Sequence, residues 1–183
     1  MKRYVNKIPV EIQLKKLLKR KFYIEAIETG TIRNNNPEHL STLRIAKILE
    51  GKGKLISVDN NKPFIDFSRN ICKEVNNVIW ILDDALMHLK KYPVNCFDFL
   101  LIDTFNEKQY CFDQFIEGLR IVRDDGIIMV DDAGLTEEQR SWQDKPEKAH
   151  LIVKYLNDRL LPYTLQGNMF IFDMKDLEYE IRK

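Results

Sequence analysis

Four segments of this chain are apolar runs that close on acidic residues. They read FYIEAIE, KLISVD, FDFLLID and GIIMVDD, and the closing acids are Glu28, Asp59, Asp103, Asp131 and Asp132. A buried strand that ends in a carboxylate presents that acid along one edge of a parallel sheet, and open α/β sheets bind ligands at this edge. The pattern therefore predicts a site that holds a ribose, an amine or a metal ion.

Apolar runs and helical patterns alternate along the chain, which is typical of βαβ units and a parallel sheet. We expect strands at 22–28, 54–59, 78–82, 97–103 and 126–130. We expect helices at 8–20, 41–50, 63–74, 85–91, 108–122 and 147–160. Two short apolar runs, 163–165 and 169–172, flank Gln166-Gly167-Asn168 and predict a terminal antiparallel hairpin.

Length and composition set the outer limits of the architecture. The 183 residues contain no internal repeat or low-complexity linker, which favours a single domain over 1–183. No apolar run approaches the ~18 residues that a membrane span needs. The N-terminus lacks the features of a signal peptide, and the three cysteines have no metal-binding spacing. We expect a cytoplasmic protein with reduced thiols and no transmembrane segment.

Residues 1–21 form a basic N-terminal helix region, ahead of an α/β core in 22–183. This stretch carries +7 and the whole chain +1, which leaves −6 on the core. A basic arm could bind nucleic acid, an anionic membrane or an acidic glycan. The alternative, which we favour, is a solvated helix face beside the apolar stripe of Val10, Leu14, Leu17 and Leu18.

Each acid has a structural explanation beside the functional one. Asp59 is placed to hold ribose hydroxyls, or to favour a helix N-terminus through the helix dipole. Asp84 is placed to accept from an exocyclic amine, or to cap the next helix. Asp103, Asp131 and Asp132 end neighbouring strands ~5 Å apart, where carboxylates repel one another unless protons or a cation neutralise them.

Carboxylate oxygens are ligands for Mg²⁺, Ca²⁺ or Mn²⁺ rather than for zinc. The histidines His39, His88 and His150 are far apart in sequence and offer no zinc set. The alternative for the last acid pair is a polar turn in which one acid caps the following segment. We expect a divalent cation such as Mg²⁺ at the three acids.

The segments ETGT, SVDN, LDDALMHL, FDFLLIDTFNEKQY and RDDGIIMVDDAG, in this order, resemble the class I S-adenosylmethionine-dependent methyltransferases. The resemblance covers about residues 22–134 and the terminal hairpin. More narrowly, the chain is similar to the cation-dependent O-methyltransferase and cephalosporin-hydroxylase-like branch. It implies an α/β fold, a Rossmann-like three-layer sandwich around a mostly parallel seven-stranded sheet with a C-terminal antiparallel hairpin.

The resemblance also implies site residues. The first connection would wrap the methionine part of S-adenosylmethionine, the second strand end would hold the ribose, and the third would contact the adenine. The implied cofactor-binding residues are Glu28, Gly30, Thr31, Ser41, Asp59, Asn60, Asp84, Ala85 and Asp103, and the implied metal ligands are Asp103, Asp131 and Asp132.

The chain departs from the family pattern at three places. The first connection has one glycine and a long polar loop before Ser41, Asp83 replaces a common glycine, and 104–106 replaces small or acidic residues. No general base can be assigned; His150, Lys108 and water are the alternatives.

The activity implied is methyl transfer from S-adenosylmethionine to a hydroxyl of a small-molecule or glycan acceptor, with help from a divalent cation. The acceptor pocket would come from the N-terminal helix, the 30–40 loop, the 135–147 segment with Trp142, or a second subunit of a homo-oligomer. One alternative is a non-catalytic nucleotide- or partner-binding module. Another is a nucleic-acid methyltransferase, which the lack of an N/D-P-P-Y/F motif disfavours.

Overall fold

The computed structural model describes residues 8–36, 39–134 and 148–177, and its centre is one seven-stranded sheet. The strands lie in the order β3-β2-β1-β4-β5-β7-β6. The first five are parallel, and β7 runs antiparallel to both β5 and β6. This confirms the predicted sheet and hairpin. The bounds are β1 Ile24–Thr29, β2 Gly53–Asp59, β3 Val78–Leu82, β4 Phe97–Ile102, β5 Val122–Val130, β6 Thr164–Gln166 and β7 Met169–Asp173.

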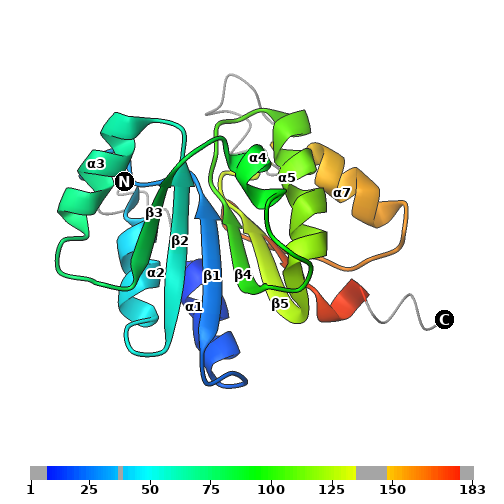
Figure 1. Cartoon of the computed structure of the whole chain (residues 1–183). Helices are drawn as coiled ribbons and strands as arrows, with labels where there is room; N and C mark the ends of the chain where they lie inside the picture. Colours follow the sequence, from blue (N-terminus) through cyan, green and yellow to red (C-terminus); the bar gives the residue numbers. More distant parts are fainter. Residues whose placement is uncertain (1–7, 37–38, 135–147, 178–183) are drawn as a thin grey trace, which may run out of the picture.

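Helices cover both faces of the sheet, with α1, α2 and α3 on one side and α4, α5 and α7 on the other (Figure 1). Alternate residues of β5 serve the two faces: Ile128 and Val130 join the apolar cluster under α5 and α7, whereas Ile127 and Met129 join the cluster under α1 and α2. The fold is the expected three-layer sandwich. The helix bounds are α1 Ile8–Leu18, α2 Ser41–Ile48, α3 Lys62–Ile71, α4 Ala85–Leu89, α5 Lys108–Ile121 and α7 His150–Asn157.

Several boundaries differ from those expected from the sequence. β1 begins at Ile24 rather than at residue 22, because Phe22 and Tyr23 are exposed where the chain arrives from α1. β5 begins at Val122, directly after α5, so the expected turn at 124–126 lies inside the strand. A register shift opposite Phe97 and Phe99 accommodates this early start.

The basic N-terminal region forms α1, which packs on the sheet. Leu14 and Leu17 are fully buried in the core, whereas Lys15 and Lys16 on the other side of the helix are exposed. This arrangement agrees with a solvated helix face. The basic residues of 1–7 lie outside the described residues. None of the described helices combines the length and the hydropathy that a membrane span needs.

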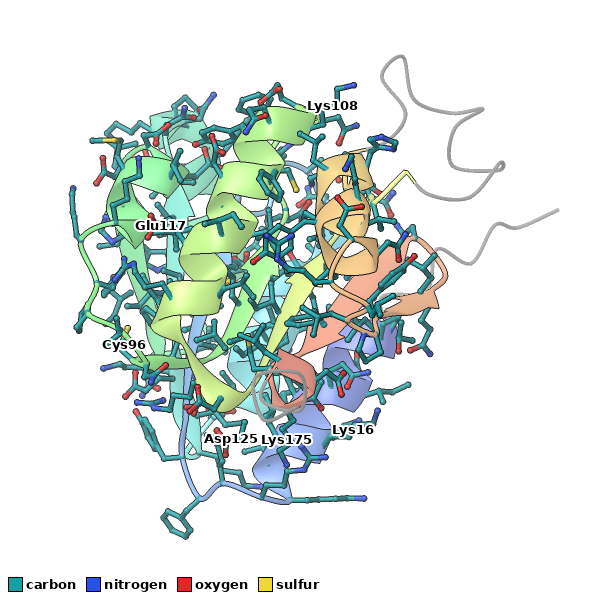
Figure 2. The ribbon with its side chains drawn as sticks, turned by 90° about the vertical axis from the view of Figure 1, so that its right-hand side faces the viewer. Lys16, Cys96, Lys108, Glu117, Asp125 and Lys175 are labelled. Atoms are coloured by element: carbon teal, nitrogen blue, oxygen red, sulfur yellow. The ribbon has the colours of Figure 1, made fainter. Side chains whose placement is uncertain are left out.

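An ion-pair network ties the start of β1 to β4 and β5. Lys21 donates to Asp98 at 2.7 Å and also to Asp125, and Arg123 reaches Asp98 at 2.8 Å. Figure 2 shows Asp125 at the opposite end of the molecule from Lys108, the first residue of α5. Burial opposes the charge of Lys21, but its hydrogen bonds to Asp125 and Asp98 outweigh this and raise its pKa above the usual 10.5. The stability that the charge of Lys21 contributes is therefore fully present from neutral pH up to about 10.5, and it is lost as the pH rises through the raised pKa of Lys21.

Replacing Lys21 by Met is expected to lower the free energy of unfolding by about 2 kcal/mol. The loss stays below the ~3–5 kcal/mol of a fully broken buried pair, because Asp98 keeps Arg123 and the Glu25 amide as partners. Urea unfolding at neutral pH measures it. The control is Lys15→Met, whose exposed pair with Glu11 should contribute no more than about 0.5 kcal/mol. Equal losses in the two variants would contradict the network's importance.

Candidate functional site

The topological switch point of the sheet lies between β1 and β4, whose connections leave toward opposite faces. Gly30 follows β1 with φ +88°, and a Cβ placed there would lie 2.2 Å from the carbonyl oxygen of Asp103. The backbone is held from both sides: the Gly30 amide donates to Val58 at 2.8 Å, and the Asp103 amide donates to Thr29 at 2.8 Å. Only glycine fits here. Ligands of open α/β sheets bind in the crevice at such a point.

A cavity of about 160 Å³, called here the first cavity, opens at this edge of the sheet. Four of the predicted cofactor residues line it, and they come from three successive strand ends: Gly30, Asp59, Asn60 and Ala85. The structure thus brings together residues that are 55 positions apart in the chain (30 to 85). Seven further lining residues are not among the predicted cofactor residues: Arg33, Val58, Asn61, Phe64, Thr104, Phe105 and Tyr110.

Asp59 ties the first two connections to each other. Its carboxylate accepts from the amide of Thr31 at 3.1 Å and from the amide of Asn61 at 2.8 Å. Asn61, and not Asp59, caps α3 by accepting from the Phe64 amide at 3.3 Å. Each carboxylate oxygen can accept two hydrogen bonds, so Asp59 can still accept from ribose hydroxyls.

Asp84 caps the following helix, which is the structural alternative predicted for it. It is the N-cap of α4 and accepts from the Met87 amide at 2.9 Å. Its other oxygen accepts from the Tyr110 hydroxyl at 2.8 Å, and burial together with this hydrogen bond raises the pKa of Tyr110 to about 12. The Tyr110 ring stacks on Phe105 with centroids 5.0 Å apart. Asp84 therefore fixes an aromatic wall of the first cavity.

Glu28 and Ser41 do not line the first cavity. Glu28 is fully buried and accepts from Thr42 and, at 2.8 Å, from Ser57. Thr31 belongs to the same polar layer, since its hydroxyl donates to Ser68 at 2.7 Å. This layer joins the first connection to β2, α2 and α3. Glu28 therefore supports the connection after β1 through buried hydrogen bonds to α2 and β2.

A second cavity, also of about 160 Å³, adjoins the first through Arg33, which lines both. The Arg33 guanidinium donates to the Asp103 carbonyl at 2.9 Å and lies 6.0 Å from the centroid of the Phe64 ring. Every described residue that lines the second cavity is polar: Thr31, Arg33, Asn34, His39, Asp103 and Asp132. No local pattern in the sequence marked Arg33, because it lies in a loop without periodicity.

Known proteins resemble this chain in fold. No protein-family model and no curated protein matches the chain. Among solved structures, the N-methyltransferase NodS from Bradyrhizobium japonicum WM9 in complex with S-adenosylhomocysteine is 14% identical in sequence and superposes with a TM-score of 0.58. The match covers 93% of this chain and 89% of NodS. The O-methyltransferase from Bacillus cereus in complex with the same ligand is 18% identical, with a TM-score of 0.60; the match covers 91% of this chain and 80% of the other. A candidate caffeoyl-CoA O-methyltransferase from Staphylococcus aureus is 14% identical, with a TM-score of 0.66; the match covers 92% of this chain and 83% of the other.

The chain has the fold of the class I S-adenosylmethionine-dependent methyltransferases. At these identities the similarity establishes the fold alone. The neighbours include both an N-methyltransferase and an O-methyltransferase, so the methyltransferase fold by itself does not fix the acceptor atom.

On this methyltransferase fold, the three acids predicted to hold a metal are only partly brought together. Asp103 and Asp132 line the second cavity. The Asp131 carboxylate is buried and accepts from the Asp132 amide at 3.0 Å and from the Asn168 side chain at 3.3 Å. Among the described residues, no three His, Cys, Asp or Glu side chains are arranged to hold a metal ion. The donor set for a divalent cation is therefore not assembled by this part of the chain.

The two side chains considered as a general base lie away from both cavity linings. Lys108 begins α5, and His150 begins α7. The histidine that does line a cavity of this methyltransferase fold is His39, beside Asp103 and Asp132. It had been considered only as a zinc ligand.

Proposed function

We propose that this chain is an S-adenosylmethionine-dependent methyltransferase that methylates a hydroxyl of a polar acceptor. The observation that carries the proposal is the first cavity, which lies at the switch point of a methyltransferase fold and contains Gly30 and Asp59. Two solved structures of this fold contain S-adenosylhomocysteine.

The lining residues suit the parts of the cofactor. The Asp59 carboxylate would accept from the ribose hydroxyls. The wall of Phe105 and Tyr110, next to Ala85, would pack against the adenine ring. The guanidinium of Arg33, above the Gly30 turn, would bind the carboxylate of the methionine part.

The second cavity is the proposed acceptor site. A methyl carried over the Gly30 turn would lie close to both cavities, because Arg33 lines each of them. Hydrogen-bonding groups make up its whole described lining, which favours an acceptor rich in hydroxyls, such as a sugar, over a flat aromatic one. In the reaction the acceptor oxygen attacks the methyl carbon, S-adenosylhomocysteine leaves, and the hydroxyl proton passes to a base. Within this lining, His39, Asp103 and Asp132 are the groups that can take that proton.

The contribution expected of the protein is mainly alignment. The sulfonium is already a reactive methyl donor, and holding the acceptor oxygen in line with it can lower the barrier by ~7–11 kcal/mol. Because the described residues do not assemble the ligands of a metal ion, alignment and proton transfer rest on the side chains of the two cavities.

The test is transfer of labelled methyl groups to three acceptor pools: oligosaccharides with polyols, catechols, and RNA. We expect label in the first pool, and label only in catechols or in RNA would contradict the acceptor class. Asp132→Asn alters the second cavity but not the first, so it should reduce transfer while S-adenosylhomocysteine affinity stays within about twofold. An equal loss of both would contradict the division into two cavities.

A further inference from the structure

Lys148 places a buried cation at the sheet edge where the sequence pattern predicts a metal ion. Its side chain is 1% exposed. Its ammonium donates to the carbonyl of Thr104 at 2.8 Å and to the carbonyl of Asp131 at 2.9 Å. These two carbonyls follow the ends of β4 and β5. A buried ammonium is tolerated only where partners replace its water, and here the ends of two neighbouring strands provide them.

The backbone holds Lys148 firmly in this position. The amide of the next residue, Ala149, donates to the carbonyl of Ala133 at 3.0 Å, and the Ala133 amide donates to the carbonyl of Asn168 at 2.9 Å. Ala149 is fully buried and immediately precedes α7. The backbone at Lys148 is therefore anchored to the segment that follows β5, and it leads directly into α7.

The expectation of a metal ion rested on three neighbouring acids that need neutralisation. The structure provides donors of three kinds at these acids. The Lys148 ammonium donates to the backbone carbonyls of Asp131 and of Thr104, the residue that follows Asp103. The Arg33 guanidinium donates to the Asp103 carbonyl. The side-chain amide of Asn168 donates to the carboxylates of Asp131 at 3.3 Å and Asp132 at 3.0 Å.

We infer that the Lys148 ammonium is the resident cation of this edge and replaces the divalent ion. A divalent ion at the same acids would be repelled by a fixed ammonium of like charge. Lys148 is thus a positioning residue: it holds the ends of β4 and β5, which carry Asp103 and Asp132 into the second cavity. Only the acceptor role of that cavity rests on the proposed function; the choice of cation does not.

The test measures Mn²⁺ binding directly, by the loss of the free-ion signal in electron paramagnetic resonance and by the shift in Tm. Wild type should bind no Mn²⁺ saturably and keep its Tm. Lys148→Met frees the carbonyl oxygens of Thr104 and Asp131, which can complete the ligand set that the acidic side chains alone do not provide. This variant should gain saturable binding, and Mn²⁺ should raise its Tm by a few degrees. The matched control is Lys154→Met on α7, whose exposed pair with Asp158 at 2.6 Å lies on the surface; it should behave as wild type.

Two results would overturn the inference. One is saturable Mn²⁺ binding to wild type that Asp132→Asn abolishes. The other is a folded Lys148→Met that gains no Mn²⁺ binding. If Lys148→Met does not fold, the wild-type titration decides alone. None of these readouts needs S-adenosylmethionine, so a failure of the proposed function, seen as absent S-adenosylhomocysteine binding, remains distinguishable.

Discussion

Replacing Gly30 by alanine is expected to destabilise the fold by roughly 3–5 kcal/mol and to abolish cofactor binding. Its φ of +88° costs an L-residue ~1–2 kcal/mol. The added Cβ would also lie 2.2 Å from the oxygen and 2.7 Å from the carbon of the Asp103 carbonyl. That carbonyl cannot retreat easily, because the Asp103 amide is bonded to Thr29 and β4 is paired with β1. Overpacking of this kind adds ~1–3 kcal/mol or more.

Urea unfolding and calorimetry with S-adenosylhomocysteine measure the two effects of Gly30→Ala. Gly51→Ala is a close control, since Gly51 also has a positive φ, +68°, but a Cβ there would meet nothing within 4 Å. It should lose only ~1–2 kcal/mol and bind S-adenosylhomocysteine as wild type does. Similar losses in the two variants would mean that the close approach of Gly30 to Asp103 is not what makes this turn special.

Replacing Asp59 by asparagine is expected to weaken S-adenosylhomocysteine binding by roughly 10- to 150-fold. Hydrogen bonds to a charged group are worth ~1.5–3 kcal/mol each, and 1.4 kcal/mol is about tenfold in Kd. The substitution removes the charge that would accept from ribose. It also weakens the bonds that hold the Thr31 and Asn61 amides around the first cavity.

Calorimetric titration of folded Asp59→Asn gives this ratio. Asp66→Asn is the matched control, because Asp66 lies on α3 in an exposed pair with Lys62 and outside the lining of the first cavity. Its affinity should stay within about twofold of wild type. An Asp59→Asn protein that keeps its fold and its affinity would remove the ribose assignment.

The sheet could be predicted because its evidence is local. Each strand is a short apolar run, and β3 begins and ends where the sequence placed it, at Val78 and Leu82. The start of β5 was wrong because Asp124 and Asp125 are typical turn residues, yet they continue the strand out of α5 beside the Lys21 network. That contact joins residues 104 positions apart, which no local pattern reports.

The site could be predicted only in part, for a similar reason. A strand end fixes where a backbone arrives, which was enough to place Gly30 and Asp59 at the first cavity. It does not fix the direction of a side chain: Glu28 lies opposite Ser57 and bonds to it within the sheet layer. Arg33 and Lys148 come from irregular segments, so periodicity could not show that they lie at the same edge.

Titration of the wild-type protein with S-adenosylhomocysteine in excess chelator shows whether the first cavity binds the cofactor without a metal ion. We expect saturable one-to-one binding that ATP at the same concentration does not reproduce, because the sequence contains neither a P-loop nor a GxGxxG turn that would hold phosphates. The chelator should leave the affinity unchanged. A folded protein that shows no saturable binding of S-adenosylhomocysteine would rule out the first cavity as the cofactor site.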